Sequence, residues 1–175
     1  EERKINEINT GVFILQKEFL LDAVDRLTPN NAKGEYYITD IVKMAGGASS
    51  FAAPDCNEAH GINSRSQLAH AASLMQMRIN ERFMEEGVTL IDPRGAWISP
   101  EATIAGDVEI WPGVQVMGKT VIETGVKIMP NTWIGNSHVG AGCTVGNNCL
   151  LENTSIEKGT DIPAYSRVQE KCPAD

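Results

Sequence analysis

The chain has 175 residues and 42% hydrophobic content, so it can bury the core of one medium domain or of two small ones. Its formal net charge is −8 and no run of Lys or Arg exceeds two residues, which argues against nucleic-acid and anionic-membrane partners. It contains neither an apolar run of about 18 residues, the length of a membrane span, nor a signal segment at its start. We therefore expect a soluble, cytoplasmic protein.

The four cysteines do not indicate a metal site or a disulfide scaffold. They form no CxxC pair, and no histidine lies at ligand spacing from them: Cys56, Cys143, Cys149 and Cys172. Four thiols in a chain of this length suit a reducing compartment. The sequence starts with Glu1 rather than Met, which we interpret as a processed product, a fragment or a truncated chain.

The first 60 residues carry signals of both helices and strands. Residues 11–15 and 49–53 are short apolar runs that predict strands. A helix is predicted around the apolar stripe from Phe19 to Leu27, and a second, short helix lies within residues 34–46 and ends at Gly46. This segment is α/β material that is too short to close a sheet alone.

Residues 64–87 give the clearest helix signal in the chain. Ser64 and Gln67 have the spacing of a capping box, and Gly87 is a terminator. The apolar residues that recur on one face predict its packing stripe: Leu68, Ala72, Met75, Ile79 and Phe83. About 22 residues at about 1.5 Å each make a connecting arm of about 33 Å.

From Ile98 onward, a branched apolar residue recurs at every sixth position, with two steps of five. The thirteen members are Ile98, Ile104, Ile110, Val116, Ile122, Ile128, Ile134, Val139, Val145, Leu151, Ile156, Ile162 and Val168. The residue two positions before each member is always small or β-branched, as expected if both point inward from a short strand. Glycines and asparagines fall between them, where the chain must turn.

This pattern predicts a parallel β-helix with three short strands and three corners per 18-residue coil, in about four coils. It resembles the hexapeptide-repeat family, and the left-handed sense is taken from that resemblance. The position before each inward residue points outward. One face carries Trp97, Gln115, Trp133, Leu150 and Arg167. We predict that Trp97, Trp133 and Leu150 form an association surface, the alternative being scattered exposed tryptophans.

Three further stretches extend the resemblance to the rest of the chain. "INEINTGVF" at 5–13, "GEYYITDIV" at 34–42 and "GINSRSQLA" at 61–69 are similar to successive motifs of the pyrophosphorylase domain of bacterial bifunctional N-acetylglucosamine-1-phosphate uridylyltransferases. "GVTLIDP" at 87–93 and "IGNSHVG" at 134–140 are similar to that family's β-helix entry and early coils. The match covers nearly the whole chain in order.

The resemblance implies uridylyl transfer from UTP to N-acetylglucosamine 1-phosphate, with Mg²⁺ on the phosphates. It implies that Asn9 hydrogen-bonds the sugar, and that Asn63 contacts the nucleotide sugar and offers a hard amide oxygen to Mg²⁺. Tyr37 and Thr39 would line the acetamido-sugar pocket. Two alternatives stay open: Asn9 could only form a turn, and Asn63 could only be part of a helix cap.

Two features of the family have no counterpart in this sequence. The Gly-rich nucleotide loop after a first strand is missing, as is the aspartate that would share Mg²⁺ with Asn63. The solenoid stops before the coils expected to carry acetyl transfer, and His138 is predicted to face outward without a carboxylate partner. We therefore expect neither acetyl transfer nor turnover by this chain alone.

The predicted fold class is an α/β fragment of a nucleotidyltransferase domain (residues 1–63), a connecting helix (64–87) and a left-handed β-helix (88–175). The predicted function is the sugar-binding and assembly portion of a nucleotide-sugar pyrophosphorylase. Its expected partners are a nucleotide sugar, further copies in a homotrimer and a nucleotide-binding half on another segment or chain. The alternatives are a non-catalytic trimerising or regulatory module and, third, a hexapeptide acyltransferase.

Overall fold

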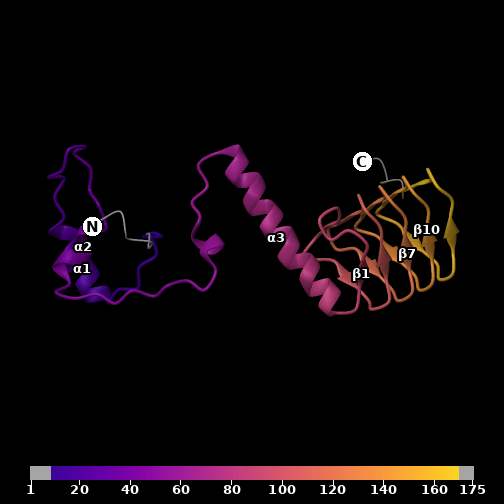
Figure 1. Ribbon diagram of the computed structural model, residues 1–175, viewed down its shortest axis with the longest axis horizontal. Coiled ribbons are helices and arrows are strands. Elements are labelled where there is room, and N and C mark those ends of the chain that lie inside the picture. Colours follow the sequence, from indigo (N-terminus) through magenta and orange to yellow (C-terminus); the bar gives the residue numbers. More distant parts are fainter. Residues whose placement is uncertain (1–8, 170–175) are drawn as a thin grey trace, which may run out of the picture. The chain divides into compact units, whose positions relative to one another are not determined.

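The computed structural model describes residues 9–169, which form two compact units, one up to Ile62 and one from Asn63 onward. Figure 1 shows the helices of both units and the strands of the second. Within the described residues, no helix combines the length and the apolar character that crossing a membrane would require.

The first unit contains two of the predicted helices. α1 (Lys17–Asp25) contacts α2 (Asp40–Met44), and each helix buries one side chain, Ala23 and Ile41. α2 ends just before Gly46, which has a positive φ of 65° as expected of a residue that follows a helix. A short 3₁₀ helix, η2 (Cys56–Ala59), follows and was not predicted.

The two strands predicted in the first unit are wrong. Residues 11–15 and 49–53 form no strand, and the side chains of Ile14 and Phe51 are 99% and 88% exposed. A strand is stable only when its backbone pairs with a neighbour, and the described residues of this unit supply none. Apolar sequence alone therefore did not produce a strand here.

The long helix of the second unit, α3 (Arg65–Glu85), has the predicted ends. The Ser64 hydroxyl accepts a hydrogen bond from the Gln67 backbone N–H at 3.2 Å. The Gln67 side chain reaches back to the N–H of Asn63 at 2.7 Å, one residue earlier than a standard capping box. The helix is followed by Gly87, whose φ is 94°.

The predicted packing stripe of α3 is wrong in part, although Phe83 is buried and Ile79 packs against the core as predicted. Leu68 and Met75 are 56% and 57% exposed, whereas the buried residues of the helix are Gln76, Asn80 and Phe83. The reason is the surface that α3 covers, which is the open end of the solenoid and presents backbone carbonyl groups. Side-chain amides can hydrogen-bond such groups and apolar side chains cannot.

The remainder of the second unit is a parallel β-solenoid of three sheets (Figure 1). Sheet A contains β1 (Thr89–Leu90), β4 (Glu109–Ile110), β7 (Lys127–Ile128), β10 (Thr144–Val145) and β13 (Asp161–Ile162). Sheet B contains β2 (Trp97–Ile98), β5 (Gln115–Met117), β8 (Trp133–Gly135), β11 (Leu150–Glu152) and β14 (Arg167–Gln169). Sheet C contains β3 (Thr103–Ile104), β6 (Val121–Ile122), β9 (His138–Val139) and β12 (Ser155–Ile156).

The thirteen predicted inward positions each lie in one of the strands β2 to β14. Twelve of them are buried and Val168 is partly buried, so they form one continuous core. The buried hydroxyl residues of the second inward row are satisfied: Thr120, Thr132 and Ser137 each donate to a backbone carbonyl at 2.7–2.8 Å. The parallel pairing is consistent with the predicted left-handed β-helix.

The solenoid is longer than predicted, with about five turns rather than four. β1 precedes the ladder, pairs with β4 and buries Leu90. The coil length also changes along the solenoid: Trp97, Gln115 and Trp133 pair at intervals of 18 residues, and Trp133 pairs with Leu150 after 17. The shorter coils follow from the two five-residue steps that the sequence already shows.

Candidate functional site

Asn63 lies immediately before the N-cap residue of α3 and is exposed. Its backbone N–H is bonded to Gln67, but among the described residues its side-chain amide makes no hydrogen bond. Both ends of that amide are therefore available to a ligand. The neighbouring N-terminus of the 21-residue helix carries partial positive charge, which favours an anionic group nearby.

Asn9 forms a local turn in the first unit. Its side-chain oxygen accepts a hydrogen bond from the N–H of Gly11 at 2.9 Å, and Gly11 has a positive φ of 78°. The turn that the sequence left as an alternative is therefore present. The amide nitrogen of Asn9 stays free of hydrogen bonds among the described residues, so sugar binding by this residue stays a prediction.

Tyr37 and Thr39 lie at the start of α2. The Tyr37 hydroxyl donates to the Glu35 carboxylate at 3.1 Å, and Thr39 is exposed at the N-cap position. The pKa of Tyr37 is raised by desolvation first, then by the bond to Glu35 and the charge of Asp40. The phenol therefore stays neutral at physiological pH and keeps its hydrogen-bonding capacity.

The predicted sugar-binding residues are divided between the two units. Asn9, Tyr37 and Thr39 belong to the first, and Asn63 belongs to the second. No hydrogen bond joins Asn9 to Tyr37 or Thr39 in the described part of the chain. The common pocket of these four residues stays a prediction.

The predicted association surface lies on the outer side of sheet B, which we call the B face. Trp97, Trp133 and Leu150 belong to strands that pair in one sheet, as the spacing predicted. Trp97 is 47% exposed, and the Trp133 ring lies over Gly135, where a side chain would meet it at 2.2 Å. Met117, 40% exposed, adds to this apolar row. Sequence reasoning missed Met117, although it lies two residues after Gln115 on the same strand and therefore on the same face.

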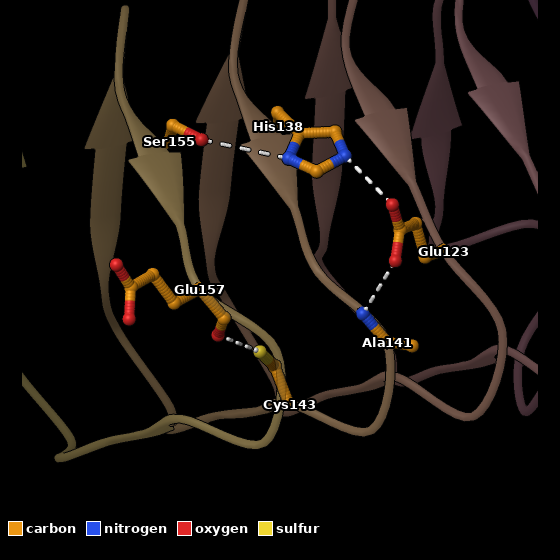
Figure 2. A network of polar contacts seen from close by, with 6 residues as sticks. All are labelled: Glu123, His138, Ala141, Cys143, Ser155 and Glu157. Atoms are coloured by element: carbon orange, nitrogen blue, oxygen red, sulfur yellow. Dashed lines mark hydrogen bonds and ion pairs between the residues drawn. The ribbon is translucent and has the colours of Figure 1, made fainter.

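On the outer side of sheet C, His138 takes part in a polar network that joins three coils (Figure 2). The Glu123 carboxylate lies 3.0 Å from Nε2 of His138 and accepts a second hydrogen bond from the N–H of Ala141 at 2.9 Å. The hydroxyl of Ser155 lies 3.5 Å from Nδ1 of His138. The expectation that His138 has no carboxylate partner is therefore wrong.

This network holds the imidazole in one orientation. The hydrogen bond from Ala141 is the first cause, and the His138 contact the second, of a lowered pKa for Glu123. An ionised Glu123 only accepts hydrogen bonds, so Nε2 of His138 donates to it, and Nδ1 faces the hydroxyl of Ser155. Both side chains of the pair are nearly half exposed to water, at 44% and 46%.

The described residues do not make a complete metal site. No cluster of three or more His, Cys, Asp or Glu side chains occurs among residues 9–169. Asn63 offers one neutral oxygen, whereas Mg²⁺ is held through carboxylates and substrate phosphates in an octahedral shell. The residues present therefore do not fit a self-contained Mg²⁺ site.

Known proteins resemble this chain along almost all of its length. The bifunctional protein GlmU of Clostridium novyi is 39% identical over 176 residues, 98% of this chain and 38% of the relative. GlmU of an Exiguobacterium species is 43% identical over 175 residues, 98% of this chain and 39% of the relative. GlmU of Geobacillus thermodenitrificans is 46% identical over 144 residues, 80% of this chain and 31% of the relative. No family model matches the chain.

The chain belongs to the GlmU family. It spans less than two fifths of the length of the GlmU relatives named above. The kinship assigned from the sequence motifs is therefore confirmed for the family. Most of each relative lies outside the match.

Proposed function

We propose that this chain is the sugar-binding and assembly portion of a nucleotide-sugar pyrophosphorylase that transfers a uridylyl group from UTP to N-acetylglucosamine 1-phosphate. The observation that carries the proposal is the relationship to bifunctional GlmU proteins over 98% of the chain. Two structural features support it: a ligand-ready amide at the start of α3 and an apolar outer face on the solenoid.

The proposed sugar contacts are hydrogen bonds from neutral groups. The free amide nitrogen of Asn9 and the hydroxyl groups of Tyr37 and Thr39 would recognise the acetamido sugar. The amide of Asn63 would contact the nucleotide sugar, and its oxygen would contribute to a Mg²⁺ shell together with acidic ligands from elsewhere.

The proposed partner of the first unit is a nucleotide-binding half on another segment or chain. Val12, Ile14 and Phe51 support this partner, because they are 79%, 99% and 88% exposed although each belongs to a run with strand-forming sequence. Burying such side chains typically contributes about 1.5–3 kcal/mol each. Pairing with strands of a larger sheet would supply both that burial and the missing backbone hydrogen bonds.

The proposed assembly is a homotrimer through the B face of the solenoid. The row of Trp97, Met117, Trp133 and Leu150 is apolar on a chain of net charge −8, and such rows favour association.

Isothermal titration of the chain with UDP-N-acetylglucosamine and Mg²⁺ tests the sugar-binding role. We expect Asn63→Ala to weaken binding at least about tenfold, because a hydrogen bond to a charged ligand contributes about 1.5–3 kcal/mol. Asn30→Ala, at an exposed asparagine remote in sequence from the motifs, is the matched control. Equal affinities for wild type and Asn63→Ala would contradict the role of Asn63. A folded chain that binds no ligand would instead favour the trimerising module.

A second candidate function is acyl transfer on the solenoid, and the His138–Glu123 pair favours it. An imidazole oriented by a carboxylate is the usual arrangement of a general base. Equilibrium dialysis with acetyl-coenzyme A tests this candidate, with His138→Ala as the companion variant. Retention of the ligand by the unsubstituted chain would support acyl transfer, and no retention would exclude it.

A further inference from the structure

The solenoid leaves a defined row of backbone acceptors at the end where α3 lies. Each coil donates its N–H groups to the carbonyl groups of the following coil: Trp97 donates to Val114 at 3.0 Å and Ser99 donates to Val116 at 2.7 Å. β2 is the first strand of sheet B. The carbonyl groups of Ala96 and Ile98 therefore have no preceding strand of sheet B to donate to them.

Two side chains of α3 occupy this row. The amide nitrogen of Asn80 donates to the carbonyl of Ala96 at 3.0 Å and to that of Pro93 at 2.7 Å. The amide nitrogen of Gln76 donates to the carbonyl of Ile98 at 3.1 Å and to the side-chain oxygen of Asn80 at 3.0 Å. Asn80 is 0% and Gln76 9% exposed. The two amides therefore replace the N–H groups of an absent coil.

The spacing of these groups selects one register for the helix. Four residues of α-helix advance about 6 Å, and two residues of a strand advance about 6.6 Å, so Gln76 and Asn80 match Ile98 and Ala96. A slip of one residue rotates a helix by about 100° and turns both amides away from the carbonyls. The apolar contact of Phe83 with the core is non-directional and tolerates small rotations far better.

We propose that Gln76 and Asn80 are positioning residues that fix the register of α3 on the solenoid and thereby place Asn63 relative to the B face. The functional part of this inference depends on the proposed role of Asn63. At about 1.5 Å per residue, Asn63 lies about 26 Å along the helix from Asn80, so a tilt of about 10° at the contact displaces it by about 4–5 Å. A shift of that size separates Asn63 from any ligand group that is held on the solenoid or on a partner bound at the B face.

Spin-label distance measurements on the whole chain test the register directly. In a Cys56→Ser, Cys172→Ser background, labels are placed at the exposed positions Ser66 on α3 and Thr103 on β3. We expect one narrow distance distribution for the unsubstituted helix. The double variant Gln76→Leu, Asn80→Leu is expected to broaden it or shift it by several ångströms, whereas Glu81→Leu on the exposed side of α3 leaves it unchanged.

A double variant that keeps the narrow distribution overturns the proposal. If the double variant unfolds, the distance distribution is measured instead on the single variant Gln76→Leu, which removes one of the three hydrogen bonds to backbone carbonyls. In parallel, UDP-N-acetylglucosamine with Mg²⁺ is titrated into each variant. We expect the double variant to bind this ligand at least about tenfold more weakly than Glu81→Leu does. Equal affinities despite a shifted distance would overturn the functional part. Absence of binding by the unsubstituted chain would instead refute the proposed function, so the two failures are distinguishable.

Discussion

Gly146 tests how closely the coils of the solenoid are stacked. A Cβ at this position would lie 2.5 Å from the backbone nitrogen of Ala164, 2.8 Å from its Cα and 2.9 Å from the carbonyl oxygen of Ile162. Ordinary contacts begin at 3.4 Å. The next coil would therefore have to move by about 0.9 Å. All three atoms are backbone, so no side-chain rotation can relieve the contact.

Gly146→Ala is expected to destabilise the chain by about 3 kcal/mol, the upper end for overpacking. Gly142 gives the matched control, because an added Cβ there meets nothing within 4 Å and only the positive φ of 69° opposes the substitution. The control is expected to cost about 1 kcal/mol. Both substitutions add one methyl group, and only Gly142 has a positive φ, so a larger loss of stability at Gly146 is attributed to the close approach of the coils.

Urea denaturation followed by circular dichroism measures this difference. With a slope of about 2 kcal/mol per molar urea, the midpoint should fall by about 1.5 M for Gly146→Ala and by about 0.5 M for Gly142→Ala. Equal midpoints for the two variants would show that the coils have room for a methyl group. The stacking described above would then be wrong.

Two further predictions concern the outer faces. Trp133→Glu should lower the solution mass measured by light scattering, because it places a charge in the centre of the apolar B face. The control Lys127→Glu, on sheet A, should leave the mass unchanged. An unchanged mass for Trp133→Glu would show that the B face takes no part in the assembly. The pKa of Glu123 is lowered in the folded state, so its contribution to stability is present above the ordinary carboxyl pKa of 4.5 and is lost as the pH falls through the lowered value. The urea midpoint of the wild type should therefore fall more steeply below about pH 4.5 than that of Glu123→Gln, and parallel curves would contradict the contact with Ala141 and His138.

The solenoid could be predicted because its information is local. Each coil buries its own inward side chains and pairs only with its two neighbours, so the six-residue spacing specifies both the core and the register. Counting along the chain placed Trp97 and Trp133 on one sheet without any knowledge of the fold. Only β1 was missed, since Leu90 stands eight residues before the regular ladder begins.

The His138–Glu123 contact is one that the residue spacing of the solenoid could have predicted. His138 pairs with Val121, 17 residues earlier, and Glu123 lies two residues after Val121, so both side chains point out from the same face. The proximity of Glu123 and His138 could have been predicted from the sequence, because the five-residue step before Val139 gives the 17-residue pairing. Deciding that the carboxylate turns toward the imidazole required the side-chain geometry.

The sequence by itself determined the three α-helices, the caps of α3, the inward ladder of the solenoid and the membership of the family. Tertiary structure alone decided which face of α3 is buried, because that depends on the carbonyl groups of Ala96 and Ile98 rather than on the periodicity of the helix. It also decided that residues 11–15 and 49–53 are not strands. Strand pairing and amide docking need a partner remote in sequence, and a local pattern does not contain that partner.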